Sequence, residues 1–308
     1  MDFKEPLSSY QLIAIVGPTA SGKSDYAEKL ALKIVNSGNK CALINADSFS
    51  LYRKMDIGTA KPNILERKKL ENQGVKYYQI DILDPLEISN AALYQASTLK
   101  IINFLHKNNS IPILVGGSGL YVRTITDDFK FQPVDLSLRK QLEKRAEAEG
   151  TEHLYQELLN KDPNTAKTLN PENTRRIIRA LEVIQITGLP FIPNLPQYTN
   201  RFPKTLQLGL KLSREEIDKK IDIRTQKMRD LGLENEVRNL YQNNELGPTA
   251  KKAIGYSEFI DYFENKNNPA DNKPLTLDST FTNIANHTKR LVRRQLSWFT
   301  RDPRILWV

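Results

Sequence analysis

Short apolar runs alternate with helical stretches along the first third of the chain. The runs that we expect to form strands are residues 12–16, 41–45, 77–80 and 111–115, the third being the weakest. The helices expected between them are 24–34, where Tyr26, Leu30 and Ile34 lie four residues apart on one face, 64–73 and 91–106. Continuous apolar runs are typical of strands buried on both faces, so the alternation predicts an α/β fold with a parallel sheet.

The pattern changes at about Phe129. Two charged helical stretches, residues 137–160 and 172–187, follow there, and little strand pattern remains. Four prolines then crowd into a short stretch, at Pro190, Pro193, Pro196 and Pro203. Because proline lacks a backbone N–H and interrupts helices, this stretch is predicted to be a loop.

An alternating apolar run at residues 206–212 has the pattern of a strand that returns to the sheet. The elements expected beyond it are helices at 214–230, 233–242, 249–263 and 279–299, an exposed loop at 265–272 and a closing strand at 304–308. We therefore expect one core built from residues 1–128 and 204–308, interrupted by a helical insertion at residues 129–203.

The composition narrows the classes of protein to which the chain can belong. Of its 308 residues, 39% are hydrophobic, which supports an ordinary globular core. Its single cysteine, Cys41, excludes an internal disulfide and suits a reducing compartment, so we expect a cytoplasmic protein. No apolar run approaches the length of about 18 residues that a membrane span requires. Neither Cys41 nor the dispersed histidines make a metal-ligand pattern.

A glycine-rich motif connects the first predicted strand to the first predicted helix. It fits the phosphate-binding P-loop pattern G-x-x-x-x-G-K-[ST] at every fixed position and consists of Gly17, Pro18, Thr19, Ala20, Ser21, Gly22, Lys23 and Ser24. A turn of this kind directs backbone N–H groups and a helix N-terminus at one anion. We expect Lys23 to reach the terminal phosphate oxygens and Ser24 to hold Mg²⁺.

Asp47 and Arg224 are the other candidates for chemistry. Asp47 follows the second predicted strand and is expected at the same sheet edge as the P-loop, where a carboxylate accepts a proton or holds Mg²⁺. The alternative is an aspartate that caps the next turn. Arg224 is a candidate to neutralise diphosphate charge, although a helix arginine is more often a solvated charge. The strand 111–115 ends in glycine without a following aspartate, which favours group transfer over ATP-driven motion.

Two clusters of basic residues indicate a polyanionic partner on a chain whose net charge is +9. The first cluster, on a helix of the insertion, consists of Arg175, Arg176 and Arg179. The second, on the last helix and its tail, consists of Lys289, Arg290, Arg293, Arg294, Arg301 and Arg304. Arginines at helical spacing suit contacts to successive phosphates of a nucleic acid, and the alternative is a solvated helix face.

Six segments of the chain combine into one larger pattern. They are residues 17–24, 45–48, 52–62, 115–121, 173–182 and 293–299. In this order and spacing they resemble the bacterial type of the tRNA dimethylallyltransferase (tRNA isopentenyltransferase) family, over essentially the whole chain. The part 55–62 is highly specific to that family, whereas the P-loop alone is not. The resemblance implies a P-loop parallel-sheet core with an inserted helical domain that contacts tRNA.

The resemblance also implies an activity and a set of site residues. The family transfers a dimethylallyl group from dimethylallyl diphosphate to N6 of adenosine 37, next to the anticodon, in tRNAs reading codons that begin with U. By matching position, Asp47 is implied as the general base, and the implied diphosphate or Mg²⁺ contacts are Thr19, Lys23, Ser24 and Arg224. The implied tRNA contacts are Asp47, Ser48, Phe49, Ser50, Ser118, Arg139, Arg175, Arg176, Arg179, Lys252, Gly255, Tyr256 and the helix 286–295 with Lys289, Arg290, Arg293 and Arg294.

The partners that the resemblance implies are a tRNA anticodon stem-loop and dimethylallyl diphosphate, with Mg²⁺ as the cofactor, no membrane and a monomeric protein. The main alternative is a small-molecule kinase that binds ATP with the same P-loop. A second alternative is a non-enzymatic RNA-binding ATPase. The two basic clusters argue against the kinase, and the missing strand-end aspartate argues against the ATPase.

Overall fold

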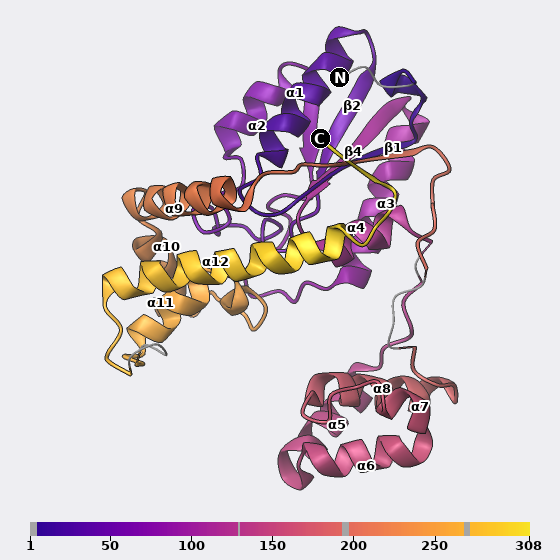
Figure 1. Ribbon diagram of the computed structural model, residues 1–308, viewed down its shortest axis with the longest axis vertical. Helices are drawn as coiled ribbons and strands as arrows, with labels where there is room; N and C mark the ends of the chain where they lie inside the picture. Colours follow the sequence, from indigo (N-terminus) through magenta and orange to yellow (C-terminus); the bar gives the residue numbers. More distant parts are fainter. Residues whose placement is uncertain (1–4, 129, 193–196, 268–271) are drawn as a thin grey trace. The chain divides into compact units, whose positions relative to one another are not determined.

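The computed structural model describes residues 5–128, 130–192, 197–267 and 272–308. The chain forms two compact units, one made of Met1–Asp128 with Asn200–Val308 and the other of Phe129–Thr199. The first unit contains the sheet, and the described part of the second unit is helical (Figure 1). Pro193 and Pro196 of the predicted loop, and residues 268–271 of the predicted exposed loop, lie outside the described residues. No helix in the described ranges is long and apolar enough to span a bilayer.

Six parallel strands form one sheet in the order β3-β2-β4-β1-β5-β6, which confirms the predicted α/β core. The strands are β1 (Leu12–Val16), β2 (Lys40–Asn45), β3 (Val75–Tyr78), β4 (Ser110–Gly116), β5 (Thr205–Gly209) and β6 (Ile305–Trp307). Val16 pairs with both Gly116 and Gly209, and Asn45 pairs with Val115. The segments that follow β1, β2, β4 and β5 therefore leave the sheet at the same edge.

Helices cover both faces of this sheet (Figure 1). Those around it are α1 (Lys23–Asn36), α2 (Ile64–Glu71), α3 (Ala91–Lys107) and α4 (Gly119–Thr126), after a 3₁₀ turn at Leu7–Ser9. Every residue of β1 and β4 is buried, as continuous apolar runs predict. Beneath α1, Leu30 and Ile34 pack on Ile13 and Ile15 of the first strand. The P-loop helix is thereby fixed directly above the strand that leads into it.

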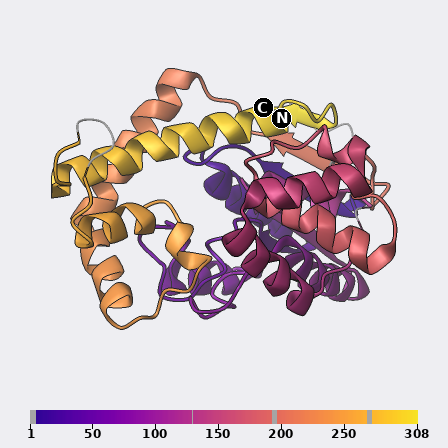
Figure 2. The same ribbon diagram turned by 90° about the horizontal axis from the view of Figure 1, so that it is seen from below.

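A second group of helices lies beside the sheet within the same unit (Figures 1 and 2). It consists of α9 (Arg214–Asp230), α10 (Leu233–Gln242), a 3₁₀ turn (Ala250–Lys252), α11 (Tyr256–Phe263) and α12 (Leu277–Phe299). Its apolar core includes Val237, Phe259 and Phe281, together with Tyr52 and Met55 from the loop that follows β2. In both views α12 runs from this group toward the sheet. The loop after β2 is therefore packed between the sheet and the helical group.

The helical unit has an apolar core of its own. It contains α5 (Leu136–Glu149), α6 (Thr151–Lys161), α7 (Pro163–Ala166) and α8 (Thr174–Thr187). Leu142, Leu154, Leu158 and Leu181 come from three of these helices and form one buried cluster. The helical unit therefore has the hydrophobic core that is typical of a domain.

Several predicted elements differ from the structure, and the backbone explains most of the differences. The single helix expected at 137–160 is broken at Gly150, whose φ of +87° lies in the left-handed region. The helix expected at 249–263 is likewise interrupted before Gly255, with φ of +97°. The strand expected at 77–80 begins two residues earlier, and the one expected at 206–212 ends at Gly209. The short helices α4 and α7 were not predicted, because their length gives little periodicity.

Candidate active site

The P-loop forms a tight turn between β1 and α1. Gly22 has φ of +84° and Ala20 has φ of +66°, so the backbone is left-handed at both residues before α1 begins at Lys23. The first N–H groups of a helix have no partner within the helix and point out of its N-terminus. Because β1 ends at the shared edge of the sheet, these donors are directed toward that edge.

A pocket lies at this edge, and it brings together residues from six separate stretches of the chain. Its lining residues are Thr19, Lys23, Ser24, Asn45, Asp47, Ser50, Thr59, Ala60, Lys61, Pro62, Tyr77, Ile80, Val115, Gly116 and Arg224. The three residues proposed from the sequence as catalytic, Lys23, Asp47 and Arg224, all line it. Ser24 and Thr19, the proposed Mg²⁺ and diphosphate contacts, line it as well.

The charges in the pocket favour an anionic ligand. Burial lowers the pKa of Lys23 to about 8, against the opposing attraction of Asp47 and with a further lowering by Arg224. Burial also lowers the pKa of Arg224, whose Nη2 donates to the Thr59 carbonyl at 3.0 Å. Two poorly solvated cations thus face a single carboxylate, and an anion that entered the pocket would restore the charge balance.

Asp47 is held in a fixed turn. Its Oδ1 accepts a hydrogen bond from the Phe49 N–H at 3.0 Å, and its own N–H donates to Asn45 Oδ1 at 3.1 Å. Asn45 Nδ2 in turn donates to the carbonyls of Asp47 and Gln79, both at 2.9 Å. The turn-capping role considered from the sequence is therefore present, and it orients a carboxylate that also lines the pocket.

The turn after β4 supports the Asp47 loop from the other side. Ser118 Oγ accepts from the Ser48 N–H at 3.2 Å, and the Ser118 N–H donates to the Ala46 carbonyl at 3.2 Å. A Cβ atom at Gly116 would lie 2.2 Å from that same carbonyl oxygen, so only glycine allows this approach. Ser118 thus holds the loop, and Ser50 is buried at its far end.

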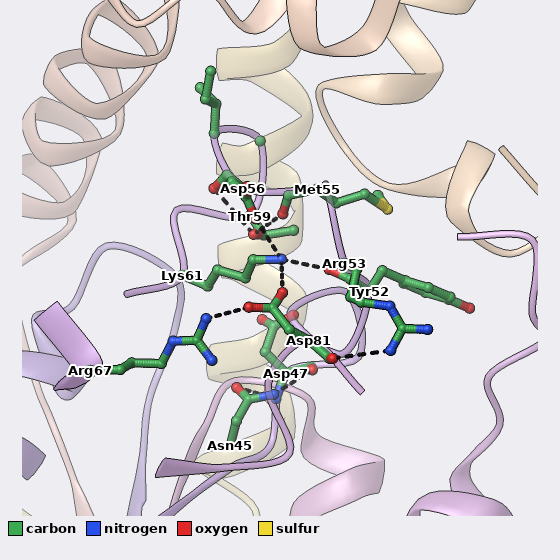
Figure 3. A network of polar contacts seen from close by, with 12 residues as sticks. Asn45, Asp47, Tyr52, Arg53, Met55, Asp56, Thr59, Lys61, Arg67 and Asp81 are labelled. Carbon is green, nitrogen blue, oxygen red and sulfur yellow. Dashed lines mark hydrogen bonds and ion pairs between the residues drawn. The ribbon is translucent and has the colours of Figure 1, made fainter. Parts of the chain in front are cut away.

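The segment 52–62 is organised around a buried lysine (Figure 3). Lys61 Nζ donates to the Tyr52 carbonyl at 2.5 Å and pairs with Asp56 Oδ1 at 2.8 Å and Asp81 Oδ1 at 2.5 Å. Asp81 also pairs with Arg67. Only 2% of the Lys61 side chain is exposed, so these contacts replace its hydration. The loop that lines one side of the pocket is therefore folded around a single cation.

Glu236 of α10 also fixes the segment 52–62, through hydrogen bonds to its backbone. Its carboxylate accepts from the backbone N–H groups of Asp56, Ile57 and Gly58 at 3.0, 2.8 and 3.2 Å. The Tyr256 hydroxyl donates to it at 2.5 Å, and a Cβ atom at Gly58 would lie 2.4 Å from the Tyr256 ring. Tyr256 is fully buried, and its expected contact with tRNA stays a prediction. Its side chain supports the loop.

The first basic cluster and the neighbouring Arg139 include both structural and exposed residues. Arg139 Nη2 and Arg179 Nη1 each lie 2.6 Å from Oε2 of Glu182, a carboxylate with no exposed surface. Arg179 also donates to two backbone carbonyls. These two arginines neutralise a buried charge, and their contact with tRNA stays a prediction. Arg175 and Arg176 lie exposed on the same helix.

The second cluster is divided in the same way. Arg304 pairs with the buried Asp127 at 2.7 Å and with Asp302 at 2.6 Å, so it fastens the C-terminal strand and is not a surface cation. Lys289 pairs with Asp222 of α9 at 2.8 Å. The members of this cluster on α12 that remain exposed are Arg290, Arg293 and Arg294. Lys252 of the 3₁₀ turn is exposed too, whereas the neighbouring Gly255 is buried.

A family model described as IPP transferase matches residues 50–302 of the chain. The chain belongs to the IPP transferase family. It is 43% identical over 298 residues to a tRNA dimethylallyltransferase of Bifidobacterium animalis subsp. lactis, a match that spans 97% of this chain and 82% of the relative. To the tRNA dimethylallyltransferase of Thermobifida fusca it is 40% identical, over 96% of this chain and 89% of the relative.

Solved structures agree with this membership of the IPP transferase family. The full-length tRNA isopentenylpyrophosphate transferase of Bacillus halodurans is 32% identical, with a TM-score of 0.65 over 96% of this chain and 89% of that one. A eukaryotic dimethylallyltransferase acting on tRNA has a TM-score of 0.78 at 24% identity, over 96% of this chain and 73% of that one, and shares the fold. The family resemblance drawn from the sequence is confirmed.

Three residues of this IPP transferase family member have structural roles that were not predicted from the sequence, although Gln295 lies in the helix 286–295 that was implied to contact tRNA. They are Lys61, Glu236 and Gln295, the last of which bridges the P-loop and the turn after β4. Lys61 lies in the segment most specific to the family, which was the one available signal. Glu236 and Gln295 act on loops far away in the sequence, and a side chain at such a distance leaves no local pattern.

Replacing Lys61 by methionine should lower the free energy of unfolding by about 3 kcal/mol, because a buried ion pair is deprived of one partner. We expect the lower end of the usual range, since Asp81 keeps Arg67. Urea unfolding of both variants measures the effect, with Lys54→Met as the matched control. Lys54 pairs with Glu245 at 2.8 Å on the surface and should contribute less than about 1 kcal/mol. Equal losses of stability in the two variants would contradict the role assigned to Lys61.

Proposed function

We propose that this protein transfers a dimethylallyl group from dimethylallyl diphosphate to N6 of adenosine 37, next to the anticodon, in tRNAs that read codons beginning with U. The observation that carries the proposal is the convergence of Lys23, Asp47 and Arg224 on one pocket beside a P-loop. Membership of the IPP transferase family supports a transferase and sets aside the kinase and the RNA-binding ATPase.

The proposed reaction needs one base and one site for negative charge. The C–O bond of the donor breaks, the diphosphate leaves with the bonding electrons, and a bond forms between N6 of adenine and the freed carbon. N6 then loses a proton, which Asp47 accepts. Lys23, Arg224 and the P-loop N–H groups stabilise the charge that develops on the diphosphate. A P-loop suits this role because it binds phosphate oxygens and does not depend on a nucleotide base.

Mg²⁺ fits the donor set of the pocket. No group of three or more His, Cys, Asp or Glu side chains that could hold a metal occurs within the described ranges, so a dedicated protein cage is not found there. Mg²⁺ commonly binds through one or two protein ligands plus substrate phosphates and water. The exposed hydroxyl of Ser24, which lines the pocket, is an oxygen ligand of that kind. Bound there, Mg²⁺ would supply positive charge to the leaving diphosphate.

The exposed arginines suit contacts to the tRNA backbone. An adenine inside a stacked anticodon loop must leave the stack to reach a pocket, so the protein has to hold the loop by its phosphates. Arg290, Arg293 and Arg294 on α12 provide one exposed basic surface, and Arg175 and Arg176 on the helical unit provide a second. We propose that both surfaces, and hence the helical unit, contact the anticodon stem-loop.

Incubation of the protein with radiolabelled dimethylallyl diphosphate, bulk tRNA and Mg²⁺ tests the proposed function. The expected result is label in RNA and a dimethylallyl adenosine after digestion to nucleosides, with no ATP added. A transcript with guanosine in place of adenosine 37 is the matched control and should take up no label. Consumption of ATP with phosphorylation of a metabolite, and no labelled adenosine, would overturn the proposal.

The two arginine surfaces give a prediction for the salt dependence of tRNA binding. Arg293→Ala with Arg294→Ala, and Arg175→Ala with Arg176→Ala, should each lower the slope of log K against log[salt] by about 0.7–0.9 for each phosphate that is no longer neutralised. Filter binding over a range of salt concentrations measures the slope. Lys54→Met, which removes one exposed cation elsewhere, should keep the wild-type slope. Unchanged slopes in both double variants would assign these residues to a solvated surface.

A further inference from the structure

Gln295 of α12 joins the two glycine-rich turns at the edge of the sheet. Its side chain is buried, with 8% exposed. Oε1 accepts a hydrogen bond from the Thr19 N–H of the P-loop at 2.8 Å, and Nε2 donates to the Gly117 carbonyl at 3.0 Å. The amide has one acceptor end and one donor end, and each end is used by a different turn. A carboxylate or an ammonium group at this position would satisfy only one of the two turns.

The turn after β4 is shaped to receive this helix closely. A Cβ atom at Gly117 would lie 2.6 Å from Gln295 Nε2, and one at Gly119 would lie 2.2 Å from Cδ1 of Trp298. Gln295 and Trp298 are three residues apart and therefore lie on the same side of α12. The two glycines let the helix approach the turn at a distance that any side chain would prevent.

The same helix exposes arginines beside the buried amide. Arg293 and Arg294 directly precede Gln295 and are exposed, so one helical turn combines a surface for phosphates with a contact to the P-loop. A ligand held on the exposed side restrains the position of α12, and Gln295 transmits that position to the peptide at Thr19. A hydrogen bond that fixes a binding loop in advance raises affinity by lowering the cost of ordering it.

We propose that Gln295 is a positioning residue that fixes the P-loop for the donor diphosphate and couples donor binding to RNA bound on α12. The proposal rests on the proposed function and adds that the donor site and the RNA-binding surface on α12 are coupled. Gln295 acts through the Thr19 N–H, and so it is not a catalytic residue. Coupling between two ligands is reciprocal, so the diphosphate should also tighten the binding of RNA by the same factor.

Isothermal titration with inorganic pyrophosphate, with and without an anticodon stem-loop RNA, tests the coupling. In the wild type, RNA should tighten pyrophosphate binding about fivefold or more, the low end of usual coupling factors. Gln295→Leu should weaken pyrophosphate binding by about tenfold without RNA, the scale of removing one or two hydrogen bonds, and should abolish the effect of RNA. Arg294→Ala should weaken RNA binding and keep the wild-type affinity for pyrophosphate alone.

Ser297→Ala, at an exposed position of the same helix, controls for general effects on α12 and should behave like the wild type. If Gln295→Leu does not fold, Gly117→Ala tests the same contact, because the added Cβ displaces Nε2. Wild-type affinity and coupling in a folded variant would overturn the proposal, as would the absence of coupling in the wild type. Failure of the proposed function would differ, since pyrophosphate would bind normally while no prenyl group reached RNA.

Discussion

Asp47→Asn should slow prenyl transfer at least about 100-fold, the usual scale for the loss of a general base. The substitution keeps a side-chain oxygen that can accept from the Phe49 N–H, so the turn that holds position 47 should survive. It removes the negative charge that faces Lys23 and Arg224 and the site that accepts the proton. The loss should therefore appear in the chemical step and leave tRNA affinity little changed.

Single-turnover kinetics with saturating tRNA and donor measure this step separately from product release. Asp25→Asn is the matched control, because Asp25 is an exposed aspartate in the first turn of α1, close to the P-loop in sequence. It should react at the wild-type rate. If Asp47→Asn also reacts within a few-fold of the wild type, Asp47 is not the base, and its role is limited to the turn.

The sequence predicted the site best where its residues lie close together in the chain. The P-loop pattern, the apolar run before it and the helix after it lie within one continuous stretch, and all three are present in the structure. The placement of Asp47 beside the P-loop followed from one rule, that the carboxyl ends of parallel strands share an edge. Arg224 was the weakest of the three candidates, because nothing near it in the sequence indicates a pocket.

Contacts over long sequence distances could not be predicted in this way. Arg139 and Arg179 have the composition of an RNA-binding surface, and only the burial of Glu182 shows that they neutralise an internal charge. Tyr256 belongs to a segment expected to contact tRNA, yet its ring fills the space left by Gly58. In each case the partner decides the role of the residue, and the partner is distant in the chain.

Lys23→Ala should lower the rate of prenyl transfer by about 10²–10³, the range observed when one preorganised charge-stabilising donor is removed. The fold should remain intact, because burial disfavours the charged form of Lys23 and its removal relieves that cost. Steady-state and single-turnover assays with dimethylallyl diphosphate and tRNA, in Mg²⁺ and without ATP, measure the loss. Wild-type rates in this variant would show that the leaving diphosphate is not stabilised by Lys23.

Because the pKa of Lys23 is about 8, its contact with the diphosphate should change the number of protons taken up when pyrophosphate binds. Below pH 8 the free protein carries this proton, and it loses the proton as the pH rises through 8. A bound pyrophosphate favours the charged amine and raises its pKa, so binding between about pH 8 and 9.5 should take up a proton. Titration calorimetry in buffers of different ionisation enthalpy measures the uptake. Lys23→Arg stays charged throughout this range, so the difference between it and the wild type separates Lys23 from protonation of pyrophosphate itself, and equal uptake in both would contradict the assignment.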